Sequence, residues 1–253
     1  MTIAIAQVEI SRDIQCNTEK IIEYIKSCED TDVLVFPEEM ISGYYPEDEQ
    51  YITKLNPDKI TEGIKAISQE IREKNIEVII GTALYENSKW YNTTFWFNQD
   101  GTIKYLYKKC NLSNLDRNHF TSGSQLEVID FKGISSSIQM CREIKYPEQW
   151  LYLRLQGSEI IFHINNSQVQ SDEWLSLYRT RAYENEIYVV SVNPTYPNQK
   201  FCSYTLSPKG EVLLQTEANT EKIYYFAFVV NNHISKGISQ RRTDLVDIVY
   251  KGK

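Results

Sequence analysis

The sequence predicts an α/β fold, because apolar strands alternate with amphipathic helices along most of its 253 residues. The run Ile3–Gln7 has the length and composition of a buried strand. The four isoleucines from Ile60 to Ile71 recur at spacings of four, three and four, which is typical of a buried helix face. No linker, repeat or low-complexity run divides the chain, so we expect one domain over residues 1–253.

The first half of the chain contains signals for two helices, a strand and a hairpin. Asparagine is a favoured helix cap, proline is favoured in the first helical turn, and Asp-Gly is a common hairpin turn. The expected elements are, in order, a helix capped by Asn17, a helix opened by Asn56-Pro57, a strand over 76–84, and a hairpin of residues near 90–98 with 102–107 across Asp100-Gly101.

The second half continues the alternation and ends in a further hairpin and strand. We expect the helix opened by Pro147 to carry Trp150, Leu151 and Leu155 inward. The other expected elements are strands near 126–130 and 134–140, a strand over 160–164, a helix over 172–186, a strand over 188–192, a hairpin of 204–207 with 211–215, and a strand over 223–230.

Cys141 is placed where a strand gives way to a helix. It follows the apolar run that ends at Met140, and Pro147 then opens the helix. A thiol at such a bend lies beside outward-pointing backbone N–H groups, which can lower its pKa and bind an oxyanion. An isolated cysteine after a strand is more often a small core residue, so this position alone does not establish a nucleophile.

Two other strands end in charged residues of opposite sign. The pair Glu38-Glu39 follows one apolar strand, and the pair Lys108-Lys109 ends another. Taken singly, such pairs are usually solvated loop charges. Because ligands collect at the carboxyl ends of strands in open α/β sheets, we expect carboxylate, ammonium and the Cys141 thiol to converge on one site.

Three motifs, in this order, resemble the nitrilase or carbon-nitrogen hydrolase superfamily. The family has Phe-Pro-Glu after a strand, then Tyr-x-Lys-x-x-Leu, then a Cys followed five or six residues later by aromatic-Pro-Glu. This register selects the first glutamate, Glu38, and the second lysine, Lys109. The matching segments are Phe36-Pro37-Glu38, Tyr107 to Leu112, and Cys141 with Tyr146-Pro147-Glu148, with further matches at the opening strand, Gly81, Tyr91-Asn92-Thr93, 120–123, 181–185 and 207–210.

The resemblance implies a four-layer αββα sandwich, with two sheets face to face and helices outside. It also implies a hydrolase in which Glu38 takes the thiol proton and Cys141 attacks a carbonyl carbon to form a thioester. Lys109 and the backbone N–H of Arg142 would stabilise the oxyanions. No metal or organic cofactor is required. We expect a small amide or N-carbamoyl compound, with water, as substrate.

Two positions depart from the family pattern. Members often carry a second glutamate seven residues before a glycine equivalent to Gly123, and that count reaches Asp116, a carboxylate about one methylene shorter. The residue after the nucleophile is Arg142, where a neutral group is common. Two roles for its side chain stay open: a structural ion pair with Glu143 or another acid, or a contact with an acidic substrate.

Other functions are compatible with parts of the sequence. A nitrilase, an acyl transferase to amines and a catalytically retired binding subunit are alternatives, although the intact set of Glu38, Lys109 and Cys141 argues against retirement. A papain-like partner for Cys141 among His119, His163 and His233 explains less, since His163 lies within an apolar strand.

Charge and composition limit the partners. With 27 basic and 34 acidic residues the net charge is -7, which gives no overall field to attract nucleic acid or an anionic membrane. No apolar run reaches membrane-spanning length, and five scattered cysteines fit reduced thiols, so we expect a cytoplasmic protein. By resemblance we expect at least a homodimer, with Trp150, Trp174 and the tail 231–253 as candidate contacts.

Overall fold

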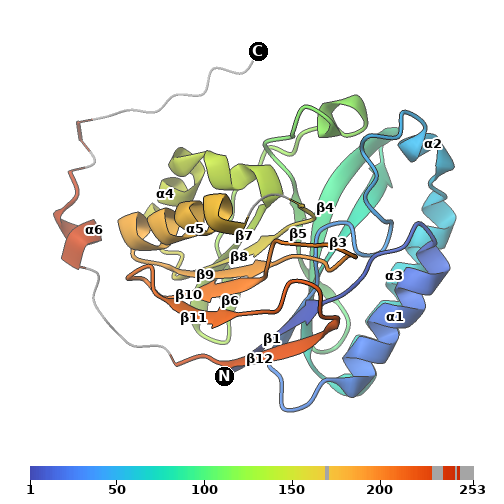
Figure 1. Ribbon diagram of the computed structural model, residues 1–253, viewed down its shortest axis with the longest axis horizontal. Coiled ribbons are helices and arrows are strands. Elements are labelled where there is room, and N and C mark those ends of the chain that lie inside the picture. The colour runs from blue at the N-terminus through green and yellow to red at the C-terminus, as the bar shows by residue number, and fades with distance from the viewer. Residues whose placement is uncertain (169–170, 230–235, 243, 246–253) are drawn as a thin grey trace.

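The protein is described by a computed structural model over residues 1–168, 171–229, 236–242 and 244–245. Two six-stranded sheets lie face to face between two layers of helices (Figure 1). The first sheet has the order β12-β1-β2-β3-β4-β5 and the second the order β11-β10-β9-β8-β7-β6. The strands are β1 (Thr2–Gln7), β2 (Val33–Val35), β3 (Glu77–Glu86), β4 (Lys89–Phe97), β5 (Ile103–Lys108), β6 (Ile129–Phe131), β7 (Ile134–Met140), β8 (Ile160–Ile164), β9 (Tyr188–Val192), β10 (Tyr204–Leu206), β11 (Val212–Gln215) and β12 (Lys222–Ala227).

The helices complete the αββα sandwich that the family resemblance predicted. Helices α1 and α3 lie side by side over the first sheet, and α4 and α5 lie over the second (Figure 1). The α-helices are α1 (Ile14–Ser27), α2 (Tyr51–Lys54), α3 (Pro57–Lys74), α4 (Pro147–Leu155), α5 (Ser171–Asn185) and α6 (Lys236–Gln240), and the 3₁₀ turns are η1 (Asp116–Asn118) and η2 (Cys141–Lys145).

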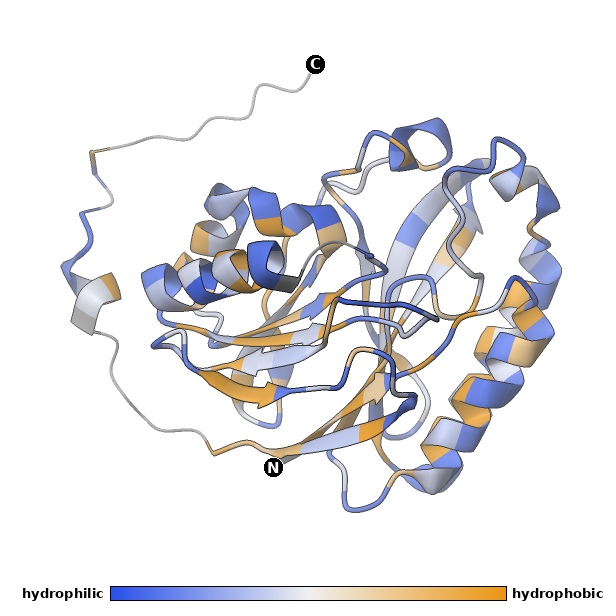
Figure 2. Ribbon diagram, in the orientation of Figure 1, coloured by the Kyte–Doolittle hydropathy of each residue, from blue (hydrophilic) through white to orange (hydrophobic). Residues whose placement is uncertain are grey.

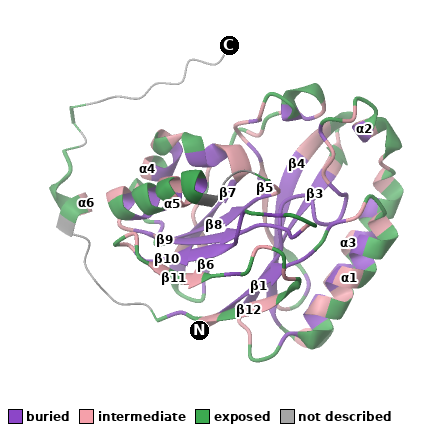
Figure 3. Ribbon diagram, in the orientation of Figure 1, coloured by how far each residue is buried: buried purple, intermediate pink, exposed green. Residues whose placement is uncertain are grey.

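Three apolar layers hold the sandwich together, and alternation along the strands assigns side chains to them. On β1, Ile3 and Ile5 face the second sheet, whereas Ala4 and Ala6 pack under α1 and α3. The corresponding layer on the other side packs Trp150 and Tyr178 against the second sheet. The strands are accordingly mostly buried, while the outer helix faces are hydrophilic and exposed (Figures 2 and 3).

Two sequence-based helix details were wrong. Helix α1 begins at Ile14, three residues before Asn17, because the Asp13 carboxylate caps it by accepting from the Cys16 N–H. In α4, Leu155 is 44% exposed and Leu153 is the buried leucine. The reason is the helical period, since positions three apart, Trp150 and Leu153, share the face that meets the sheet.

The segment that connects β5 of the first sheet to β6 of the second is longer than predicted. Strand β6 starts at Ile129 and not near residue 126. The hairpin of β4 with β5, the helix cap at Asn56 and the strands β8 and β9 are confirmed within a residue or two. Within the described ranges, no helix combines the length and apolar character that a membrane crossing needs.

Candidate active site

Glu38 lies in a tight turn that follows β2 and is shaped by a glycine of the neighbouring strand. Parallel pairing of β2 with β3 brings Gly81 beside this turn, and the Ile41 N–H donates to the Gly81 carbonyl. A Cβ at position 81 would lie 2.5 Å from the Glu39 nitrogen and 2.7 Å from the Glu38 Cα. Only glycine therefore lets the glutamate turn pack this closely on β3.

Lys109 follows β5 at the same end of the first sheet as Glu38. The strands β3, β4 and β5 pair antiparallel in turn, so β5 runs in the same direction as β3. The Lys109 N–H donates to the Asn92 carbonyl at 2.9 Å, and its carbonyl accepts from the Gly123 N–H at 2.8 Å. A Cβ at Gly123 would lie 2.1 Å from the Lys108 carbonyl oxygen. This glycine therefore lets the 120–123 segment cross directly over the lysine.

Cys141 follows β7 of the second sheet and begins the η2 turn. Its φ is +40°, a left-handed conformation that costs a non-glycine residue about 1–3 kcal/mol. The neighbouring Glu143 carboxylate stabilises the turn, since it accepts from the Met140, Cys110 and Asn111 N–H groups at 2.8–2.9 Å. The structure thus compensates a strained nucleophile position with buried hydrogen bonds.

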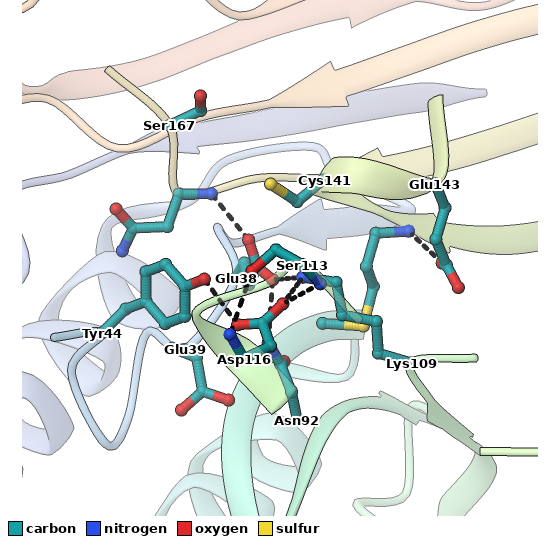
Figure 4. A network of polar contacts seen from close by, with 12 residues as sticks. Glu38, Glu39, Tyr44, Asn92, Lys109, Ser113, Asp116, Cys141, Glu143 and Ser167 are labelled. Atoms are coloured by element: carbon teal, nitrogen blue, oxygen red, sulfur yellow. Dashed lines mark hydrogen bonds and ion pairs between the residues drawn. The ribbon is translucent and has the colours of Figure 1, made fainter. Parts of the chain in front are cut away.

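The side chains of Glu38, Lys109 and Asp116 form one contact network, and all three are fully buried (Figure 4). Lys109 Nζ lies 2.7 Å from Glu38 Oε1 and 2.8 Å from Asp116 Oδ2. The charges of Glu38 and Lys109 both act on the Cys141 thiol, so the three groups belong to one site. The sequence-predicted carboxylate, ammonium and thiol therefore meet between the two sheets.

Burial and the mutual charges of these groups shift their pKa values. Burial raises the pKa of Glu38, and the Lys109 ammonium opposes that rise. Burial alone would lower the pKa of Lys109, but the two carboxylates raise it well above its usual value. Burial also raises the pKa of Asp116, yet Lys109 and the hydrogen bonds to the carboxylate bring it down to about 2. Lys109 is therefore a permanent cation held by two acids.

The thiol of Cys141 is protonated at neutral pH, because burial and the adjacent Glu38 charge raise its pKa. A protonated thiol beside a carboxylate is a donor and acceptor pair poised for proton transfer. Of the neighbouring carboxylates, Glu38 is the one whose charge raises the pKa of this thiol most, which makes it the candidate base.

Three groups that the sequence interpretation did not assign complete the network. The Asn92 side chain donates to Glu38 Oε1 at 2.8 Å, and the Asn166 backbone N–H donates to Glu38 Oε2 at 2.9 Å. The Tyr44 hydroxyl donates to Asp116 Oδ1 at 2.6 Å. Asn92 lies in a matched segment and was open to prediction, but a backbone donor such as Asn166 leaves no signal in residue type.

The neighbouring charged residues are placed differently from one another. Lys108 lies 2.5 Å from Glu86 at the surface, as expected for a loop charge. Glu39 is fully buried, where Ser42 and Tyr51 hydrogen-bond to it, and burial raises its pKa well above the usual value. Glu39 is therefore a neutral acid that packs behind the turn.

The ion pair of Arg142 with Glu143, one of the two roles left open for the Arg142 side chain, is not formed. Both Glu143 oxygens are taken up by backbone N–H groups and by the Tyr107 hydroxyl at 2.8 Å. Within the described part of the chain, the Arg142 guanidinium has no ion pair, and its residue is partly exposed. The acid it was expected to meet points instead into the core of the η2 turn.

The two histidines that the structure describes do not partner the thiol. His119 contacts the Pro46 carbonyl, and His163 contacts the Cys141 carbonyl rather than its sulfur. His233 lies outside the described residues.

Residues 2–232 match the carbon-nitrogen hydrolase family. The chain belongs to that family. Among its relatives are the 2-oxoglutaramate amidase of Bacillus subtilis, 27% identical over 85% of each chain, and an (R)-stereoselective amidase of a Pseudomonas species, 27% identical over 72% of this chain and 66% of the relative. A glutamine-dependent NAD(+) synthetase of Aquifex aeolicus is 28% identical over 88% of this chain, which spans only 41% of the synthetase.

Solved structures of the superfamily share the fold. An amidase of a Nesterenkonia species superposes with a TM-score of 0.85 at 19% identity, covering 97% of this chain and 94% of the amidase. Nit3 of Saccharomyces cerevisiae, described as a nitrilase superfamily member, gives 0.77 at 21% identity over 89% of each chain. The carbon-nitrogen hydrolase assignment thus agrees in sequence and in architecture.

Proposed function

We propose that this carbon-nitrogen hydrolase cleaves small amides through a thioester on Cys141, with Glu38 as base and Lys109 as oxyanion stabiliser. The observation that supports this most directly is the buried Glu38 carboxylate, which is paired with the Lys109 ammonium at 2.7 Å and whose charge acts on the Cys141 thiol. That arrangement supplies a nucleophile, a proton acceptor and a cation within one water-poor site.

In the first half of the reaction, Glu38 accepts the thiol proton as the Cys141 sulfur forms a bond to the amide carbon. Lys109 and the backbone N–H of Arg142 stabilise the negative oxygen of the tetrahedral intermediate. Glu38 then gives its proton to the nitrogen, the carbon–nitrogen bond breaks, and ammonia or an amine leaves. The acyl group remains on the sulfur as a thioester.

In the second half, Glu38 removes a proton from water as the oxygen attacks the thioester carbon. The same donors stabilise the second oxyanion, the carbon–sulfur bond breaks, and the proton returns to the sulfur. Asn92 and the Asn166 N–H hold the Glu38 carboxylate in place in both halves, since each donates to a different oxygen. Asp116 fixes Lys109 from the far side.

Relatives named as amidases guide the choice of substrates, because one is named a 2-oxoglutaramate amidase and another an (R)-stereoselective amidase. We infer an amide of low molecular mass, neutral or bearing a carboxylate. An N-carbamoyl compound uses the same steps, with the carbamoyl carbon as the site of attack.

The deciding experiment measures ammonia release by the purified protein from propionamide, butyramide, glutaramate, N-carbamoyl-β-alanine and butyronitrile. We expect the fastest release from one of the amides, and loss of that release in Cys141→Ala. Release from butyronitrile alone would establish a nitrilase instead. No release from any compound, together with no covalent labelling of Cys141, would indicate a retired subunit.

A further inference from the structure

A second hydrogen-bonded chain ends at the nucleophile, at its backbone carbonyl and not at its thiol. His163 on β8 is fully buried, and its Nε2 lies 3.1 Å from the carbonyl oxygen of Cys141. Its Nδ1 lies 3.0 Å from the Tyr178 hydroxyl of α5. Asn165 completes the chain, because its side-chain nitrogen donates to the same hydroxyl at 3.1 Å.

The chemistry of the two ends fixes every proton in this chain. A carbonyl oxygen only accepts, so the Nε2 of His163 must carry the hydrogen. Burial lowers the pKa of His163 to about 3, and the neutral ring therefore has a bare Nδ1 that accepts from the Tyr178 hydroxyl. The Tyr178 oxygen is then free to accept from Asn165. All the donors point in one direction, toward Cys141.

The acceptor of this chain shares a peptide unit with the proposed oxyanion donor. The carbonyl of Cys141 and the N–H of Arg142 belong to the same peptide bond, which is trans. In a trans peptide these two groups point in opposite directions. When His163 holds the carbonyl, it therefore aims the Arg142 N–H away from β8.

That N–H is available for a ligand. Arg142 is the second residue of the η2 turn, ahead of the first hydrogen bond of the helix, and within the described residues its N–H has no acceptor. Hydrogen bonds in series polarise one another, so donation to the carbonyl oxygen makes the N–H of the same peptide a stronger donor.

We propose that His163, held in one tautomer by Tyr178, orients and polarises the Cys141–Arg142 peptide so that its N–H binds the oxyanion. His163 is in this view a positioning residue that touches neither the thiol nor the substrate. The proposal rests on the proposed function, because it presupposes that an oxyanion forms beside Arg142. It also accounts for how the left-handed Cys141 conformation is maintained.

The test compares two isosteres of His163 that each keep one of its nitrogens. In His163→Gln the side-chain amide reaches the Nε2 position and can still donate to the Cys141 carbonyl. In His163→Asn the amide reaches only the Nδ1 position and that donor is lost. Trp174→Phe is the matched control, since Trp174 packs on the His163 ring without joining the chain.

Two reactions of each variant separate positioning from general damage. Hydrolysis of the fastest amide in the ammonia screen passes through an oxyanion. Alkylation of Cys141 by allyl bromide, followed by peptide mass spectrometry, uses the same sulfur and base but forms no oxyanion. We expect His163→Asn to lower kcat about tenfold to a hundredfold, with KM and the alkylation rate within about twofold of wild type. His163→Gln should recover most of the lost kcat, and Trp174→Phe should change neither rate.

Several outcomes would overturn the inference while the proposed function stands. One is an equal fall of hydrolysis and alkylation in His163→Asn, which would mean a displaced nucleophile, and another is no fall at all. A nitrogen NMR spectrum of the wild-type protein provides a test without substitution, in which we expect the Nε2–H tautomer of His163 and no titration between pH 5 and 8. An Nδ1–H tautomer would reverse the chain and refute the proposal. Failure of the proposed function would show differently, as wild-type protein that releases no ammonia.

Discussion

The ammonium of Lys109 lies 2.8 Å from Asp116, seven residues along the chain, and neither side chain is exposed. The family commonly has a glutamate where this chain has Asp116. The shorter side chain still reaches because η1 begins at that residue, and Ser113 fixes the turn by accepting from the Asp116 N–H and donating its own N–H to the carboxylate. The backbone thus supplies the reach that the missing methylene would have given.

This pairing predicts a pH-dependent contribution to stability. The pKa of Asp116 is about 2 in the folded protein and near 3.8 in the unfolded chain, so its ionised form stabilises the fold above pH 4. That contribution, roughly 2 kcal/mol, is lost as the pH falls toward 2. We expect Asp116→Asn to lower the free energy of unfolding in urea at pH 6, with a difference from wild type that shrinks between pH 4 and pH 2. If the difference in the free energy of unfolding between wild type and Asp116→Asn does not depend on pH, the charge of the Asp116 carboxylate does not stabilise the fold.

The nucleophile is tested by Cys141→Ser. Serine is a far weaker nucleophile beside a carboxylate base, so we expect loss of nearly all turnover with an unchanged circular dichroism spectrum. Cys16→Ala is the control, because Cys16 is exposed and remote from the site, and it should retain both rate and stability. Near-normal ammonia release by the serine variant would end the thioester mechanism.

Neighbouring residues of the same type test the register. Glu38→Gln and Lys109→Met should each lower kcat by at least a hundredfold, since base and oxyanion cation act in one unit. Lys108→Met should be mild, because Lys108 pairs with Glu86 and lies over the Tyr91 ring, outside the Glu38 network. Glu39→Gln should also be mild, because a buried neutral acid is replaced by a neutral amide of the same shape. A large fall of kcat in Lys108→Met and Glu39→Gln, with a small fall in Glu38→Gln and Lys109→Met, would shift the assignment by one residue.

Strand ends alone led to the expectation that a carboxylate, an ammonium and the Cys141 thiol converge, whereas the selection of Glu38 and Lys109 within their pairs came from the family resemblance. Strand boundaries were also accessible where a turn residue marks them, as at Asp100-Gly101. Features that depend on tertiary packing were not. A pair of Glu143 with Arg142 was one of two roles left open for Arg142, yet the Glu143 carboxylate turns inward. Three backbone N–H groups converge on it, two from the segment after β5 and one from the end of β7.

The buried position of two tryptophans was a further consequence of packing. Trp150 and Trp174 were predicted to contact a second subunit, but they lie in the layer between the second sheet and α4 and α5, with at most 4% of either residue exposed. Their size and apolar character could be read from the sequence. Which face of each helix is buried depends on the sheet against which the helix packs, and the sequence alone does not show that. Most of the tail 231–253 lies outside the described residues.

If α4 and α5 contact a second subunit, other side chains of these helices must form the contact. Tyr152 of α4 is 47% exposed and Tyr183 of α5 is 69% exposed. We still expect at least a homodimer, and if these helices form its interface, Tyr183→Asp should shift the sedimentation coefficient at micromolar concentration toward the monomer. Wild-type protein that sediments at monomer mass would contradict the dimer. A dimer unaffected by the substitution would place the interface elsewhere.

The last prediction concerns the side chain of Arg142, which follows the nucleophile and has no ion pair within the described residues. A guanidinium directed into the pocket pairs bidentately with a substrate carboxylate, and its loss then costs about 2 to 4 kcal/mol of recognition for acidic amides only. We expect Arg142→Gln to raise KM for glutaramate while leaving butyramide hydrolysis unchanged, since the backbone N–H at this position is retained. Arg142→Lys keeps the charge but not the two-pronged guanidinium, so its KM for glutaramate should lie between those of wild type and Arg142→Gln. Equal losses on the acidic and the neutral amide would refute recognition of acidic substrates, because the two amides share the same reacting group and differ only in the carboxylate.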